Sequence, residues 1–394
     1  TGQYNVALGA LALNQNTTGS NNTAVGNEAL DANTTASANT AIGAAALGAN
    51  TTGTANVAVG ALALDANTTA SNNTGVGYNA LGANQTGAQN SALGNAALEA
   101  NTTGNYNVAV GSQALEKNTT GAENTAVGLQ ALEENTTASY NTAFGSQALT
   151  NNTTGTKNVS VGANAKATNT TGSENTTVGY YADGADADGS YTTAIGYHAL
   201  RNNTSSGNTA LGWTAAENNT SGSINTALGK QALRFNTTGN QNTAVGEQAM
   251  EGSSGSSTPS YCTAIGFRAL ESITTGEQNC ALGYYALQGN TTGTGNVAVG
   301  DYALDANTTA NYNTAIGYQA LTTSTTATGN CAVGFQALKL NTASNNTAVG
   351  YNAGGAITTG TGNVAVGMNA LDACTTSVSN TCIGNNAGGS ITTG

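Results

Sequence analysis

One 17-residue pattern fills this chain and constrains its fold more than any other feature of the sequence. Its fullest form reads Asn-Thr/Val-Ala-Val/Ile/Leu-Gly-x-x-Ala-Leu-x-x-Asn-Thr-Thr-Gly-x-x, as in the copy that begins at Asn56. When that first Asn is numbered repeat position 1, 23 copies follow one another from Asn5 to Asn380. Position 5 is Gly and position 8 is Ala in all 23 copies. A fixed period with invariant small residues is typical of stacked, nearly identical structural units.

The array has no internal division in its sequence. Of the 22 intervals between copies, 19 are 17 residues long, two are 16 and one is 20. No linker or shift of composition separates one part of residues 1–394 from another, so we expect a single continuous repeat array. Because the chain opens and closes within a repeat, we interpret it as a segment of a longer fibre.

The repeat favours short strands over helices. Positions 1–4 are rich in β-branched residues and are followed at once by Gly, and Asn-Thr-Thr at positions 12–14 forms a second segment of extended character. Gly, Asn and Thr are poor helix formers, and no apolar spacing of a helical kind is present. The predicted fold is an all-β parallel β-solenoid, or β-roll, of about 23 coils with 17 residues per coil.

The residue types at each position predict which side chains face the interior. Position 4 is apolar in every copy and position 9 is Leu in 17, so both are expected to point inward. Position 9 becomes Gly354 and Gly388 in two copies whose position 12 becomes Ile357 and Ile391, and this exchange of volume places positions 9 and 12 in one space. Position 3 is nearly always Ala, and we expect this face to pack against partner chains in a trimer.

Asn recurs at two positions, in 21 copies at position 1 and in 16 copies at position 12. Identical Asn side chains one coil apart can hydrogen-bond to one another and to turn backbone, so a structural ladder is our main interpretation. Asn-Thr-Thr also satisfies the sequon for N-linked glycosylation, with Asn101, Asn118 and Asn135 as candidate acceptors. The ladder is favoured because position 12 partly faces inward.

Charge and composition speak against several classes of function. Charged residues make up 7% of the chain and the net charge is −12, which disfavours nucleic acid as a partner. No apolar run approaches the ~20 residues of a membrane span. The single His198 and the five scattered Cys residues suggest no metal cluster, catalytic triad or disulfide framework. We expect no enzyme activity and no cofactor.

One acidic segment is a candidate for calcium binding. Asp183, Asp186 and Asp188 lie in the most irregular copy, and Asp-x-Asp-Gly is similar to part of a calcium loop, in which several carboxylates surround a hard cation. The distal Glu of an EF-hand loop is missing. A solvated acidic loop is therefore the interpretation that we favour.

Aromatic residues at position 6 are the best candidates for ligand contact. Rings repeated at the coil spacing either stack on one another or present a strip to the sugar rings of surface glycans. Mutual stacking is the favoured interpretation. The candidate residues occur in consecutive copies and are Tyr180, Tyr197 and Trp213, followed later by Tyr318, Phe335 and Tyr351.

The string Asn-Thr-Ala-Val-Gly-x-x-Ala, as at Asn22–Ala29, resembles the head repeat of trimeric autotransporter adhesins. Arrays of the form Asn-Thr-Ala-x-Gly-Tyr-x-Ala-Leu also resemble repeat regions of large bacterial surface proteins and of phage tail-fibre-like proteins. The resemblance covers the whole chain, although the added Asn-Thr-Thr makes this repeat longer than the adhesin head repeat. It implies a left-handed, trimeric β-roll that extends from a cell or a virion and binds surfaces.

Three functions remain as alternatives. The leading hypothesis is a structural extracellular fibre or adhesin rod that mediates surface attachment or spacing through many weak, repeated contacts. An ice-binding or glycan-binding solenoid is the alternative, but ice binding calls for an outward Thr-x-Thr array, whereas Thr102 and Thr103 are adjacent. A carbohydrate-active enzyme needs paired carboxylates on one face, and the acids of position 10 vary with Lys, Arg, Gly and Thr.

Overall fold

The protein is described by a computed structural model that covers residues 2–253 and 257–392. Each repeat copy forms one coil, and the coils build the predicted all-β parallel β-solenoid; no α-helix occurs among the described residues. The chain forms two compact units, one up to Thr193 and one from Ala194 onward.

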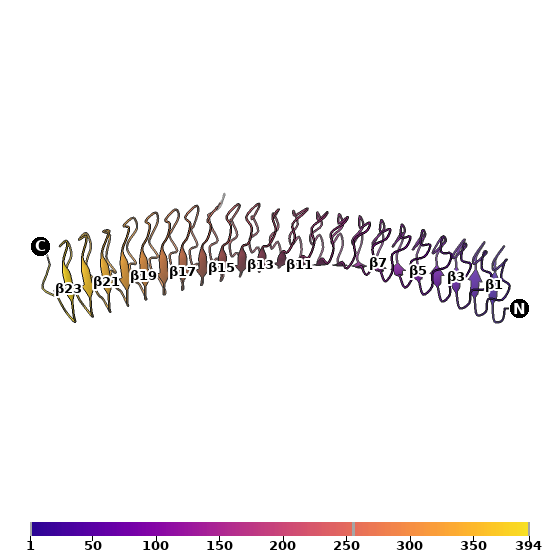
Figure 1. Ribbon diagram of the computed structural model, residues 1–394, viewed down its shortest axis with the longest axis horizontal. Helices are drawn as coiled ribbons and strands as arrows, with labels where there is room; N and C mark the ends of the chain where they lie inside the picture. Colours follow the sequence, from indigo (N-terminus) through magenta and orange to yellow (C-terminus); the bar gives the residue numbers. More distant parts are fainter. Residues whose placement is uncertain (1, 254–256, 393–394) are drawn as a thin grey trace. The chain divides into compact units, whose positions relative to one another are not determined.

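Every coil contributes one three-residue strand, at repeat positions 2–4 (Figure 1). The first unit holds β1 (Val6–Leu8), β2 (Thr23–Val25), β3 (Thr40–Ile42), β4 (Val57–Val59), β5 (Thr74–Val76), β6 (Ser91–Leu93), β7 (Val108–Val110), β8 (Thr125–Val127), β9 (Thr142–Phe144), β10 (Val159–Val161) and β11 (Thr176–Val178). The unit boundary falls within β12 (Thr193–Ile195). The second unit holds β13 (Thr209–Leu211), β14 (Thr226–Leu228), β15 (Thr243–Val245), β16 (Thr263–Ile265), β17 (Cys280–Leu282), β18 (Val297–Val299), β19 (Thr314–Ile316), β20 (Cys331–Val333), β21 (Thr347–Val349), β22 (Val364–Val366) and β23 (Thr381–Ile383).

Within each unit, consecutive strands pair in parallel with each repeat position beside the same position of the next coil. Ala109 of β7, for example, lies opposite Ala126 of β8. Positions 12–14 form no regular strand in the described coils, so the expected second extended segment is wrong as a strand assignment. This segment still joins the coils, because the Thr102 N–H donates to the Thr119 carbonyl at 2.9 Å.

The two faces of each strand show which side chains reach the core. Position 3 is fully buried within a single chain, as at Ala109, whereas position 4 is partly or largely exposed, to 52% at Leu93 and 57% at Phe144. A Cβ added at Gly75, a position 3 residue, would lie 3.4 Å from Cγ of Leu64 at position 9 of the preceding coil. Two expectations are therefore wrong. Position 4 does not point inward, and position 3 is covered by its own chain and not by a partner.

In the coils between Ala24 and Leu149 the core is thin and consists of Ala at positions 3 and 8 with Leu at position 9. Leu64 and Leu115 have no exposed surface, and burial of each such side chain contributes about 1.5–3 kcal/mol. The predicted exchange of volume is confirmed, since a Cβ added at Gly354 would lie 3.0 Å from Cδ1 of Ile357. Positions 9 and 12 therefore do share one interior space.

The chain turns back on itself within 17 residues by adopting left-handed backbone conformations at fixed positions. Gly111 at position 5 has φ of 133°, and a Cβ there would lie 2.3 Å from the carbonyl oxygen of Gly128 in the next coil. Gln113 and Leu115 at positions 7 and 9 have φ of 59° and 52°. This conformation costs a non-glycine residue about 1–2 kcal/mol of conformational free energy, and hydrogen bonds between coils offset that cost. The Leu115 N–H, for example, donates to the Ala131 carbonyl at 3.0 Å.

Candidate functional site

The two recurrent Asn positions form hydrogen-bonded ladders that run through consecutive coils inside the solenoid. At position 12, Nδ2 of Asn101 donates to Oδ1 of Asn84 at 2.8 Å and to the Gly104 carbonyl at 3.0 Å. At position 1, Nδ2 of Asn90 donates to the same Gly104 carbonyl at 2.8 Å, and its Oδ1 accepts the Asn107 N–H at 2.9 Å. Both ladders thus satisfy the buried backbone of the turn between them, which confirms the structural interpretation of these residues.

The candidate glycosylation acceptors belong to this ladder. Asn101, Asn118 and Asn135 are fully buried. Nδ2 of Asn118 donates to Oδ1 of Asn101 at 2.9 Å and to the Gly121 carbonyl at 3.0 Å. Because both N–H bonds of each amide are used, an N-linked sugar would replace a hydrogen bond of the folded coil.

The ladder of position 12 is interrupted where Asn is replaced. Oδ1 of Asn169, Asn236 and Asn307 has no hydrogen-bond partner among the described residues, although each atom is buried. The following position 12 residues are Asp186, Ser257 and Ser324, none of which carries an amide donor. These three oxygens therefore mark the places where a buried acceptor lacks the donor that the repeat normally supplies.

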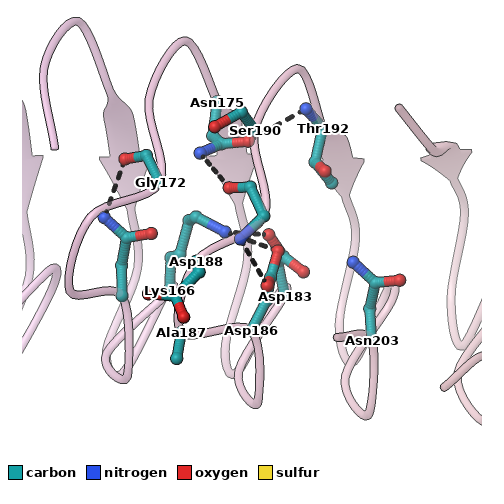
Figure 2. Close-up of polar contacts among 12 residues, drawn as sticks. Lys166, Gly172, Asn175, Asp183, Asp186, Ala187, Asp188, Ser190, Thr192 and Asn203 are labelled. Atoms are coloured by element: carbon teal, nitrogen blue, oxygen red, sulfur yellow. Dashed lines mark hydrogen bonds and ion pairs between the residues drawn. The ribbon is translucent and has the colours of Figure 1, made fainter. Parts of the chain in front are cut away.

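A fully buried ion cluster occupies the interior of two consecutive coils (Figure 2). Nζ of Lys166 lies 2.6 Å from Oδ2 of Asp183 and 3.0 Å from Oδ2 of Asp186, and the three side chains are at most 1% exposed. Oδ1 of Asp186 accepts the Gly189 N–H at 2.7 Å. Lys166 and Asp183 both occupy position 9, one coil apart, where most copies carry Leu. Opposite charges at the same repeat position in consecutive copies are the sequence signal for this pairing. The favoured interpretation of a solvated acidic loop is wrong for Asp183 and Asp186, because both carboxylates are buried against Lys166.

The structure does not bring the three calcium candidates together. Asp183 and Asp186 face Lys166 inside the coil, whereas Asp188 is exposed, and its Oδ1 accepts the hydroxyls of Thr170 and Thr171 at 2.7 and 2.8 Å. These two hydrogen bonds lower the pKa of Asp188. In the described part of the chain, no group of three or more His, Cys, Asp or Glu side chains is placed to hold a metal ion.

The aromatic candidates at position 6 stack on one another within the second unit. Phe335 lies between Tyr318 and Tyr351, with ring centroids 5.5 and 5.0 Å apart and interplanar angles of 15° and 6°. Tyr197 and Trp213 are also stacked, at 6.4 Å and 11°. In the first unit, Tyr180 makes an edge-to-face contact with its neighbour Tyr181 at 4.6 Å. The stacked geometry supports the structural interpretation, because each inner ring has its face against another ring.

The isolated His and the Cys residues make ordinary contacts. His198 stacks on Tyr197 at 3.8 Å, and its Nδ1 lies 3.3 Å from Oε1 of Glu217, whose Oε2 accepts the Arg234 Nε–H at 3.1 Å. All five cysteine thiols are free. Burial raises the pKa of the Cys262 thiol to about 11, which suppresses its reactivity as a thiolate.

The side chains of positions 2 and 4 form a regular outward face, which we call the outer strand face. Position 2 is Thr in 14 copies and Val in six, and position 4 is always apolar. In the first unit the bulkiest position 4 residues are Leu8, Ile42, Leu93 and Phe144, on β1, β3, β6 and β9, and all four are exposed. No residue of this face is charged in any copy, so within each unit the face presents hydroxyl and apolar groups only.

No protein-family model matches the chain, and no curated protein sequence matches it. No helix that is long and apolar enough to cross a membrane occurs among the described residues.

Proposed function

We propose that this chain is a structural segment of an extracellular fibre on a cell or virion surface, where it spaces or presents an attachment region. The observation that supports this function best is the uniform pair of Asn ladders. Asn101 and Asn90, for example, make the same bonds as their counterparts Asn67 and Asn39 in earlier coils. Such a solenoid gains stability from each added coil and can be lengthened by further copies of the same repeat.

The outer strand face supports lateral association of fibre copies. Eleven strands about 4.8 Å apart, each about 10 Å long, make a face of roughly 500 Å² in one unit. An uncharged face of this size is typical of interaction surfaces, and repetition along a fibre multiplies weak contacts into avidity. Ile42, Leu93 and Phe144 project from β3, β6 and β9, and the smaller Thr and Val side chains between them leave room for the projections of a second copy. The resemblance to adhesin heads sets the expected number of copies at three.

Sedimentation of the purified chain tests this association. We expect the wild-type chain to form an oligomer, and we expect a variant with Leu93→Glu and Phe144→Glu to remain monomeric because each Glu would be desolvated in the contact. Ser146→Glu is the matched control, since Ser146 is exposed at position 6, away from the outer strand face. A wild-type chain that is monomeric at every concentration would reject lateral association but not the role as a spacer.

Ice binding is a second candidate because the structure displays an outward array that the sequence did not reveal. Thr209, Thr226, Thr243 and Thr263 occupy position 2 of the consecutive strands β13–β16, next to apolar side chains at position 4. The array is Thr-x-apolar and not Thr-x-Thr. Thermal hysteresis of the purified chain tests this candidate. Ice binding would be supported if the double variant Thr226→Tyr, Thr243→Tyr lost the hysteresis while Thr237→Tyr, away from this face, kept it. A wild-type chain without hysteresis would reject ice binding.

A further inference from the structure

The buried cluster of Lys166, Asp183 and Asp186 has no explanation in the stability of the coil. These positions carry Leu, Leu and Asn in most copies, so the repeat already contains a well-packed alternative. Buried ion pairs are often no more stable than apolar side chains of similar volume, because two charges lose their hydration. Lys166 Nζ is nevertheless held 2.6 Å from one carboxylate and 3.0 Å from a second, out of contact with water.

We propose that Lys166 and Asp183 form an intramolecular isopeptide bond, an amide between Nζ and Cγ, with Asp186 as the group that transfers protons. The two reacting groups occupy the same repeat position in consecutive coils and lie in direct contact (Figure 2). The strands of these coils, β10 and β11, pair in register. The bond would therefore link neighbouring coils across one repeat without a change of register.

The reaction balances without any external reagent. A proton passes from the Lys166 ammonium to the Asp183 carboxylate, which leaves a neutral amine beside a carboxylic acid. The lone pair of Nζ attacks Cγ, the N–C bond forms, and the C–OH bond then breaks. Asp186 gives its proton to the departing hydroxyl, which leaves as water, and takes one proton from Nζ. The sum is one ammonium and one carboxylate converted to one amide and one water.

The site is built for this condensation. The contact of Nζ with Oδ2 fixes the amine next to the carbonyl carbon, and such orientation removes most of the entropic barrier of a bimolecular reaction. Burial excludes the water that would reverse the reaction. The Gly189 N–H holds Oδ1 of Asp186, which leaves Oδ2 directed at Nζ, 3.0 Å away.

A protonated Asp186 would supply the hydrogen-bond donor that the buried Oδ1 of Asn169 lacks. In the intact ladder, Oδ1 of a position 12 Asn accepts a hydrogen bond from the position 12 side chain of the next coil, as Asn84 does from Asn101. For Asn169 that next side chain is Asp186, and Oδ1 of Asn169 is buried without a partner. A carboxylate has no hydrogen to donate, whereas a carboxylic acid has one. With the amide formed and Asp186 protonated, the cluster holds no buried charge and the ladder is complete.

Intact-mass spectrometry of the folded, full-length chain tests the bond. We expect a mass lower than that of the sequence by one water molecule, and a branched peptide that joins the segment of Lys166 to the segment of Asp183. A chain that is purified in denaturant and never allowed to fold should have the full mass and should lose water only after refolding.

The repeat supplies matched controls. Asp186→Asn restores the common residue of position 12 and keeps both reacting groups, so it should fold and retain the full mass. Lys166→Leu with Asp183→Leu and Asp186→Asn restores the common repeat and should also fold without mass loss. Lys230 and Glu247 are an internal control, because they form the same one-coil contact at 2.8 Å but are 53% and 43% exposed, and they should remain unlinked.

Two results would overturn the proposal. A folded wild-type chain with the full mass of its sequence, and with ordinary trypsin cleavage after Lys166 once denatured, would leave the cluster as an ion network only. A branched peptide that forms undiminished in the Asp186→Asn variant would remove Asp186 from the reaction.

Discussion

Ala109 and Val110 are consecutive residues of β7, and their side chains lie on opposite sides of the coil wall. Ala109 is fully buried among its own coils, whereas Val110 is only partly covered and belongs to the outer strand face. Because residues on a strand alternate between its two faces, this one assignment fixes the direction of positions 2, 3 and 4 in every strand of the same kind. The strands therefore separate an Ala-lined core from the uncharged outer strand face.

Ala109→Asp should open the solenoid locally, whereas Val110→Asp should have little effect on stability. The first substitution places an unpaired carboxylate in the core, at a cost of several kcal/mol. The second places it at a partly exposed site, where substitutions usually change stability by about 0.5 kcal/mol. Hydrogen exchange of the β7 coil measures both variants, and equal protection in the two would contradict the assignment.

Asn101→Ala should destabilise its coil by about 1–3 kcal/mol, because it leaves Oδ1 of Asn84 buried without a donor. Thr103→Ala is the control, since Thr103 is exposed and adjacent in sequence. The shift of the local opening free energy, measured by hydrogen exchange, distinguishes the two. Equal exchange rates in both variants would mean that the ladder contributes nothing to stability.

Gly111→Ala should destabilise the coil by about 1–3 kcal/mol, since φ of 133° is a conformation reserved for glycine. Gly48→Ala at position 10 is the matched control, because other copies carry larger residues there, as at Asp31 and Glu99, and the atom nearest to an added Cβ is the side-chain Oδ1 of Asp65 at 2.9 Å. Thermal unfolding of the two variants side by side measures the difference. A tolerated Gly111→Ala would show that the backbone at position 5 is free to change.

The inward-facing positions could be predicted from the sequence, because their residue types fit only the interior of the coil. The inward direction of Asn101 and Leu115 follows from their recurrence and from the exchange of volume between Gly354 and Ile357. The outward direction of Val110 could not be predicted, because an apolar residue that recurs once per coil fits either a core or an exposed stripe. The sequence also does not predict the left-handed backbone conformation of Leu115, because Leu has no preference for this conformation.

The candidate site was harder to predict, and for a different reason. Asp183 and Asp186 belong to an acidic segment, and the local motif groups them with Asp188 as ligands for a cation. Their actual partner, Lys166, lies one coil earlier and is brought to them only by the parallel register. Contacts across a full repeat are invisible to local motifs, although pairing of opposite charges at one repeat position would reveal them.

Cysteine labelling tests which side chains face the core and which belong to the outer strand face. In the monomeric variant with Leu93→Glu and Phe144→Glu, we expect iodoacetamide to label Cys280 and Cys331, which lie at position 2 of the outer strand face, and to label the buried Cys262 only after unfolding. Burial raises the pKa of Cys262 from 9.0 to about 11, so only the unfolded chain ionises this thiol between these pH values. The stability of its coil should therefore fall as pH rises from 9 to 11. Rapid labelling of Cys262 in the native chain would contradict its placement.

Phe335→Ala should lower stability by about 0.5–1.5 kcal/mol for each lost ring contact, beyond the loss of buried area, because Phe335 stacks between Tyr318 and Tyr351. Glycan-array binding by the wild-type chain that disappears in this variant, without a change in thermal unfolding, would instead assign the rings to sugar recognition.

The proposal that the chain is a spacer built from interchangeable coils is tested most directly by the length of the particle. Deletion of residues 56–106 removes three whole copies, and deletion of residues 56–98 removes a similar length that is not a whole number of copies. Electron microscopy should show particles of the first variant shorter by roughly 14 Å, with fold and association intact, because each coil adds about 4.8 Å. The second variant should lose order at the junction. A three-copy deletion that abolishes folding or association altogether would contradict the account, since function would then reside in a local site and not in the repeated coil.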